Sequence, residues 1–225
     1  MGFRRLFTER TLSYVVLYSR FPFSLIAALT AGAALGIFVP LLETADAPAG
    51  NVANLVLAAG WAWAALAFCM GLSRNSRLES ITSASASLIS AVIAYYATKL
   101  AQGEFLTADL NAPSQGTQVH WYSFLSKAVF WCVAASILGP ILGLAGNLAR
   151  NRGILGYTCR MLVPLVAIAE TSERLRVEAS LQGAVAGTTW TAILLIAVAV
   201  FGVLVGNMVI NRQPRHSPGR RQTGA

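Results

Sequence analysis

The chain has 225 residues, of which 56% are hydrophobic and 12% are charged, and its formal net charge is +8. About a quarter of the residues of an average soluble domain are charged, so this composition argues against a soluble fold. Runs of about 20 apolar residues are typical of helices that span a membrane. The basic residues flank these runs and do not cover one soluble face, so nucleic acid is not the expected partner.

Residues 1–22 precede the first apolar run and predict a separate amphipathic helix on the cytoplasmic side. Aromatic residues recur near one face of this segment at helical spacing, and arginines lie roughly opposite. That pattern fits a helix that lies on the inner leaflet next to anionic head groups. Pro22 favours a break before the first span, because proline disfavours the helical conformation of the residue before it. The alternative is one longer helix that continues into the first span.

Six apolar segments follow, separated by short polar breaks. They predict an all-α fold class: a polytopic membrane protein whose transmembrane domain of six helices covers residues 23–210. The fourth segment is long enough to tilt, the third is rich in serine, and the fifth is short and contains Arg160. The predicted spans are 23–42, 52–72, 81–100, about 122–148, about 154–169 and about 184–210.

Arginine gathers in every second break, and this alternation predicts the orientation. Loops rich in arginine and lysine stay in the cytoplasm, so both termini are expected to be cytoplasmic. Residues 211–225 contain Pro, Gly, Ser and Arg but no apolar run, and they predict a disordered basic tail. The breaks on the cytoplasmic side contain Arg74 and Arg77, then Arg150 and Arg152.

Small residues at four-residue spacing predict close contacts between helices. Without the bulk of a Cβ atom, two backbones approach closely and gain dispersion contacts that lipid does not match. The same rows also suit docking to a partner membrane subunit, which stays an alternative. The residues are Ala28, Gly32 and Gly36 in the first span, and Gly139, Gly143 and Gly146 in the fourth.

Charged residues within or beside the spans are the candidates for function. Lys127 and Arg160 are basic residues placed inside apolar spans, where charge is costly and often functional; snorkelling to the interface is the alternative. Glu170 ends the fifth span, and Arg174 follows one helical turn later, which is also typical of a solvated ion-pair ladder. The predicted polar pocket consists of Lys127, Glu170, Arg174, Tyr95, Tyr96 and Ser87.

Ser87 belongs to a row of serines near one face of the third span. Serine hydroxyls bond back to their own helix and are therefore tolerated in a membrane without a function. The alternative is that the row lines a polar cavity. The sequence leaves both interpretations open.

No catalytic signature is present. The chain has neither H-E-x-x-H nor G-x-S-x-G and no P-loop, the motifs that mark common metal, hydrolase and nucleotide sites. The three cysteines lie in apolar segments without the spacing of metal ligands. No metal and no cofactor are expected, and an enzyme is less favoured than a non-enzymatic role.

Two resemblances to known families add to this interpretation. The stretch from Gly139 to Gly146, followed by Arg150 and Arg152, and the pairs Tyr95-Tyr96 and Ala169-Glu170 resemble a group of small multi-span proteins of GC-rich bacteria without an assigned activity. The row Ala28-Gly32-Gly36 is similar to the docking face of substrate-binding subunits in energy-coupling-factor vitamin transporters.

The apolar spans and the alternation of charge, together with these resemblances, predict a multi-pass protein of the bacterial plasma membrane, surrounded by the lipid bilayer. The favoured function is a small-molecule binding or transport subunit that depends on a partner. One alternative is a structural or assembly subunit of a larger membrane complex. The other is a membrane-embedded enzyme that acts on a lipid or isoprenoid substrate.

Overall fold

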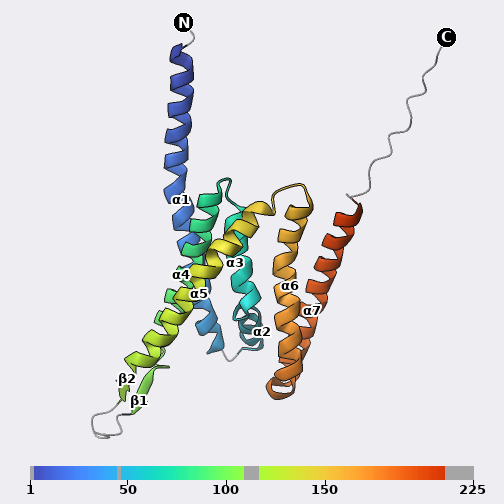
Figure 1. Ribbon diagram of the computed structural model, residues 1–225. Coiled ribbons are helices and arrows are strands. Elements are labelled where there is room, and N and C mark those ends of the chain that lie inside the picture. Colours follow the sequence, from blue (N-terminus) through green and yellow to red (C-terminus); the bar gives the residue numbers. More distant parts are fainter. Residues whose placement is uncertain (1–2, 45–46, 109–116, 211–225) are drawn as a thin grey trace, which may run out of the picture.

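The computed structural model describes residues 3–44, 47–108 and 117–210. This part of the chain forms an all-α bundle with one short β-hairpin (Figure 1). The elements are α1 (Phe3–Glu43), α2 (Pro48–Leu57), α3 (Gly60–Leu72), α4 (Arg77–Ala101), β1 (Leu106–Ala108), β2 (Thr117–Val119), α5 (Trp121–Leu148), α6 (Ile154–Val177) and α7 (Ala179–Ile210).

Among the described residues, five helical segments are long and apolar enough to cross a membrane, and the number is six if α2 and α3 count as one bent span. This agrees with the all-α class and with five of the six predicted segments. It indicates a membrane-embedded protein. The five segments are Phe23–Glu43, Arg77–Ala101, Trp121–Leu148, Ile154–Val177 and Gly183–Ile210.

The second predicted span, 52–72, is not one straight helix. Its two halves, α2 and α3, are bent by 62° at the short break between them. Ala59, just before α3, has an extended backbone with φ −70° and ψ 141°. Hydropathy does not detect the break because Ala58, Ala59 and Gly60 keep the segment apolar, although glycine is a weak helix former.

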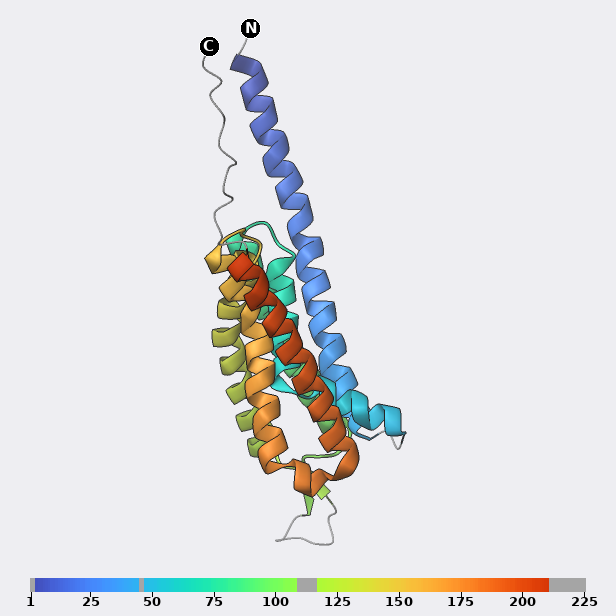
Figure 2. The same ribbon diagram turned by 90° about the vertical axis from the view of Figure 1, so that its right-hand side faces the viewer.

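The predicted break at Pro22 is also wrong. α1 runs without interruption from Phe3 to Glu43, and its N-terminal half extends well beyond the rest of the bundle (Figures 1 and 2). Proline removes one backbone donor and disfavours the helix before it, but a helix is able to continue through it. The structure therefore has the longer fused helix. The predicted tail, 211–225, lies outside the described residues.

The helices divide into two groups. α4 packs along both α1 and α5, and α3 lies against α4 and α5; we call these four helices the body. α6 and α7 pack on each other as an antiparallel pair, which we call the hairpin, and reach the body mainly through α3 and α5. The broken span α2–α3 therefore lies where the two groups meet (Figure 1).

Glycines make the closest contacts inside the body. A Cβ atom at Gly32 or Gly36 of α1 would overlap the backbone carbonyl oxygens of Ser87 or Ala91 in α4. Ala28, one turn earlier, is fully buried. The three predicted glycines of α5 make equally close contacts, Gly139 with Ser85, Gly143 with Ser80 and Gly146 with Phe68.

The hairpin lacks such contacts on its outer helix. A Cβ atom at Gly187, Gly202 or Gly206 of α7 would meet nothing within 4 Å. Near the start of α7, Gly183 lies at a kink with φ +82° and ψ −179°, a conformation that is essentially restricted to glycine. The glycines of α7 thus make no close helix contacts, unlike those of α1 and α5.

The two ends of the bundle differ in charge. One end, which we call the arginine end, carries the α3–α4 and α5–α6 turns and the end of α7, and α1 projects from it (Figures 1 and 2). The opposite end, which we call the acidic end, carries α2, the α6–α7 turn and the β-hairpin, in which Leu106 pairs with Val119. The sequence did not predict this β-hairpin. The arginine-rich breaks and the acidic breaks, which alternate along the chain, lie at opposite ends of the bundle (Figure 1).

Candidate functional site

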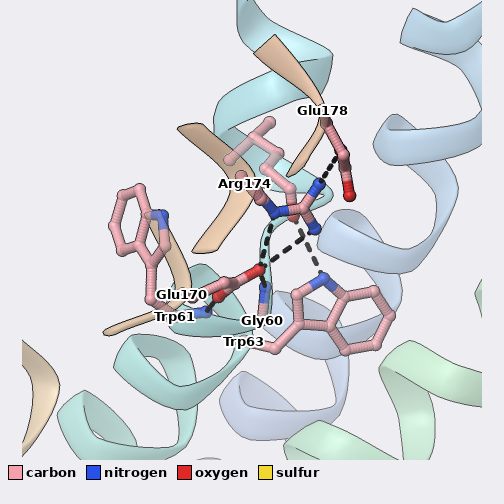
Figure 3. A network of polar contacts seen from close by, with 7 residues as sticks. Gly60, Trp61, Trp63, Glu170, Arg174 and Glu178 are labelled. Atoms are coloured by element: carbon pink, nitrogen blue, oxygen red, sulfur yellow. Dashed lines mark hydrogen bonds and ion pairs between the residues drawn. The ribbon is translucent and has the colours of Figure 1, made fainter. Parts of the chain in front are cut away.

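The break between α2 and α3 leaves backbone groups that need partners. The first N–H groups of a helix have no partner within it, and Ala59, at the N-cap position of α3, has no side-chain oxygen to accept from them. Glu170 of α6 supplies the oxygens instead. Its Oε1 accepts from the Gly60 amide at 2.9 Å and its Oε2 from the Trp61 amide at 2.8 Å (Figure 3).

Arg174, one turn further along α6, holds the same carboxylate from the other side. Its Nε and Nη2 both donate to Glu170 Oε1 at 3.1 Å, and its Nη1 lies 3.4 Å from Glu178 Oε2 (Figure 3). The Glu170 and Arg174 side chains are 22% and 30% exposed. The carboxylate thus lies between a guanidinium and the positive end of α3, both of which stabilise its negative charge.

Trp63 closes the other side of the break. Its indole Nε1 donates to the carbonyl oxygen of Leu57, the last residue of α2, at 3.0 Å (Figure 3). Tyr95 of α4 packs edge-on against Trp63, with ring centroids 6.0 Å apart, and Tyr96 packs against Tyr95 at 5.2 Å. The break is therefore held by side chains from α3, α4 and α6.

Trp190 of α7 is the fourth aromatic side chain of this region. It is 1% exposed, and the Arg174 guanidinium carbon lies 5.9 Å from its ring centroid. Its indole Nε1 is buried and has no hydrogen-bond partner within the described chain. The Trp190 N–H, close to Arg174, is thus a buried donor without an acceptor in the described chain.

The structure brings four residues of the predicted pocket into one region and places two elsewhere. Glu170 and Arg174 form the cap, and Tyr95 and Tyr96 reach it through Trp63. Lys127 is exposed, with its ammonium 5.6 Å from the Phe105 ring centroid, and it forms no ion pair with Glu170.

Ser87 and Arg160 are not part of the capped break. Ser87 is fully buried at the contact between α1 and α4, and its hydroxyl donates to the carbonyl oxygen of Ala84 at 2.8 Å, which is the back-bonding that the sequence left open. Arg160 lies near the arginine end, where its Nε donates to the carbonyl oxygen of Ala149 at 2.8 Å.

Sequence reasoning missed a second charged group, which surrounds Lys99 at the acidic end. Lys99 is 9% exposed, and its Nζ lies 3.2 Å from Glu43 Oε2 and 2.5 Å from Glu104 Oε2. The ammonium also lies 5.4 Å from the Tyr95 ring centroid. These contacts tie the end of α1 and the turn before β1 to α4. No local spacing in the sequence connects the three charged residues.

The capped break itself carried one usable signal. A glycine that follows two alanines inside an apolar run, with no capping residue before it, is a candidate for an interrupted membrane helix. Within the described chain, no group of three or more His, Cys, Asp or Glu side chains is placed to hold a metal ion.

Comparisons with known proteins identify a family but no activity. The profile of a family of unknown function (DUF6518) matches residues 17–217. No curated protein matches the chain, and no solved structure does. The comparisons thus show a family of unknown function, but nothing in them supports the expected resemblance to multi-span proteins of GC-rich bacteria or to energy-coupling-factor transporters.

Proposed function

The chain belongs to this family, DUF6518, and we propose that it is a multi-pass membrane protein that binds and transports a small solute bearing a carboxylate. The observation that carries the proposal is the carboxylate of Glu170 at the N-terminus of α3, inside a broken span. In membrane transporters, the N-termini of interrupted helices point at the anionic groups of their substrates.

The depth of the break supports a site within the membrane. α3 has 13 residues and is about 20 Å long at about 1.5 Å per residue, whereas the apolar core of a bilayer is about 30 Å thick. Because the arginine end holds the C-terminus of α3, we place that end at the cytoplasmic surface, following the distribution of arginine. Gly60 and Glu170 then lie about two thirds of the way across, where a carboxylate is a functional candidate by default.

The donors around Glu170 define the chemistry of the solute. Two backbone amides and one guanidinium converge on a single carboxylate, and the buried indole N–H of Trp190 lies beside that guanidinium without an acceptor. Arginine binds planar carboxylates with two parallel hydrogen bonds. We infer that Glu170 holds this position in the empty protein and that the carboxylate of the solute replaces it.

Charge balance then requires a proton. The charged groups that face the site are Arg174 and Glu178, and α2, α3 and α7 contain no charged residue. When a solute anion takes the place of Glu170, protonation of the displaced Glu170 side chain keeps the net charge of the site unchanged. Transport would therefore carry one proton with each anion and would be electroneutral.

Release on the other side requires motion between the hairpin and the body. Alternating access is commonly a rocking of one helix bundle against another around a fixed site. Glu170 lies on the hairpin and its amide partners on the broken span, so exchange of the carboxylate would change the contact between the two groups. The partner subunit suggested by the sequence stays a prediction.

Thermal unfolding of the purified protein in mild detergent tests the proposal. The probes are sodium acetate, lactate and succinate, with sodium chloride as the control for ionic strength. We expect at least one carboxylate to raise the midpoint of wild type and to have no effect on Arg174→Gln. The matched control is Arg176→Gln, which removes an exposed arginine of the same helix and should keep the response. A response that persists in Arg174→Gln, or none in wild type, would overturn the proposal.

A further inference from the structure

Three arginines at the arginine end are linked to one another through backbone carbonyls. The Arg150 Nη1 donates to the carbonyl oxygen of Arg74 at 2.8 Å, and Arg160 Nε donates to the carbonyl oxygen of Ala149, the residue before Arg150, at 2.8 Å. The cluster therefore joins the α3–α4 turn to the end of α5 and the start of α6. We call Arg74, Arg150 and Arg160 the arginine cluster.

The positive charges of the cluster have no carboxylate partner. None of the three arginines forms an ion pair within the described chain, whereas Lys99, Arg174 and Arg176 near the acidic end are all paired with glutamates. Arg74 donates to the carbonyl oxygen of Ser24, and Arg150 donates to Asn75 Oδ1 as well as to a backbone carbonyl. Each arginine of the cluster keeps further N–H groups, because a guanidinium has five. Arg74 Nε is buried and has no hydrogen-bond partner there.

Exposed apolar residues flank the turns that carry the cluster. Leu72 ends α3, and Ile154 and Leu155 begin α6; their side chains are 39%, 55% and 55% exposed. Unpaired positive charge beside exposed apolar side chains suits an anion that also carries hydrocarbon chains. That combination distinguishes a lipid from a soluble phosphate.

We propose that the arginine cluster binds the phosphate of an anionic phospholipid, with the acyl chains of the lipid along the exposed apolar residues next to it. Basic pockets between membrane helices on the cytoplasmic side bind lipid head groups through the same chemistry. The bound lipid neutralises the positive charges of the arginine cluster. It also holds the α3–α4 turn of the body next to the α5–α6 turn, which leads into the hairpin.

Native mass spectrometry of the full chain in mild detergent tests this proposal. The probes are dioleoyl phosphatidylglycerol and dioleoyl phosphatidylcholine, which share acyl chains and differ in head-group charge. We expect wild type to retain phosphatidylglycerol preferentially. The double variant Arg150→Gln and Arg160→Gln should bind it roughly 25-fold more weakly, at about fivefold for each arginine, with phosphatidylcholine binding unchanged.

Controls separate a built site from diffuse surface charge. Arg152→Gln removes an exposed arginine of the same turn, and it should weaken binding less than twofold. If the double variant does not fold, Arg160→Lys keeps the charge without the planar fork and should lower affinity about threefold. Equal losses in Arg152→Gln and Arg160→Gln, no preference for phosphatidylglycerol, or displacement of the lipid by 10 mM inorganic phosphate would each overturn the proposal.

Discussion

The body and the hairpin are held by different forces. In the body, 39% of the most apolar stretch of α4 is buried within the molecule, and glycine backbones touch neighbouring helices. In the hairpin, 17% of the corresponding stretch of α6 and 6% of that of α7 are buried, and the glycines of α7 have no neighbour within 4 Å of an added Cβ atom. The principal polar link between the hairpin and the body is the carboxylate of Glu170 in α6, which accepts hydrogen bonds from the first amides of α3.

From this difference we expect the hairpin to move more readily than the body. Close packing distributes its stabilising energy over many dispersion contacts, each of which is small. A charged hydrogen bond in apolar surroundings concentrates its energy in a few atoms and depends on their direction. Changes to the body should therefore affect the whole fold, and changes to the cap should release the hairpin.

The largest effect is expected when a methyl group is added inside the body. Gly36→Ala places a Cβ atom against the backbone of Ala91, and overpacking of this kind costs about 1–3 kcal/mol or more. Alanine is otherwise the better helix former by about 1 kcal/mol, so the loss runs against helix propensity. Thermal unfolding in detergent, followed by tryptophan fluorescence, should show a clearly lower midpoint.

Gly202→Ala is the matched control for this prediction. It adds the same methyl group in α7, where nothing lies within 4 Å, and should leave the midpoint unchanged or slightly higher. Equal destabilisation by both variants would mean that the body and the hairpin are not packed differently, and the comparison would fail.

A smaller and more local effect is expected from Glu170→Ala. Removal of the carboxylate leaves two amides of α3 without an acceptor and leaves Arg174 with Glu178 as its partner. Because the cap is partly exposed, the cost should be about 1–2 kcal/mol. Hydrogen–deuterium exchange should become faster at Gly60 and Trp61 and along α6 and α7, and it should stay slow at the contact between α1 and α4.

Glu173→Ala tests whether this effect belongs to the cap. Glu173 lies on the same helix, and its ion pair with Arg176 is exposed, with side-chain exposures of 65% and 78%. Exposed pairs contribute little to stability, so exchange should be unchanged. Faster exchange throughout the molecule in Glu170→Ala would contradict a separate release of the hairpin.

The parts of the structure that the sequence predicted are those that local composition determines. The apolar segments marked five of the spans, and the glycines of α1 and α5 marked surfaces where backbones meet. The cap was not predictable in the same way because Glu170 and Gly60 are 110 residues apart. Their pairing depends on how α6 lies against α3, which no local pattern records.

The charged pocket shows the same limit. Glu170 and Arg174 were recognised together because four-residue spacing places them on one helical face. Lys127 was added because an intramembrane charge is rare, but its side chain ends over the ring of Phe105. A rare residue type predicts that a position matters, and only tertiary contacts decide which partner it has.

The smallest effect is expected from Trp63→Phe, on the other side of the break. Phenylalanine keeps an aromatic ring against Tyr95 but removes the N–H that donates to the Leu57 carbonyl, a loss of about 1 kcal/mol. Trp61→Phe is the control, because Trp61 takes part in the cap through its backbone amide. Thermal unfolding should therefore show a small decrease for Trp63→Phe and none for Trp61→Phe.

Combination of Trp63→Phe with Glu170→Ala then shows whether the two sides of the break act together. Residues that support one structural element give effects that do not add, and double-mutant cycles measure the difference. Once Glu170 is lost, the break is already open, so the second change should cost less than it does alone. Additive effects would mean that Leu57 and Gly60 are held independently, and the hairpin would then be attached by packing after all.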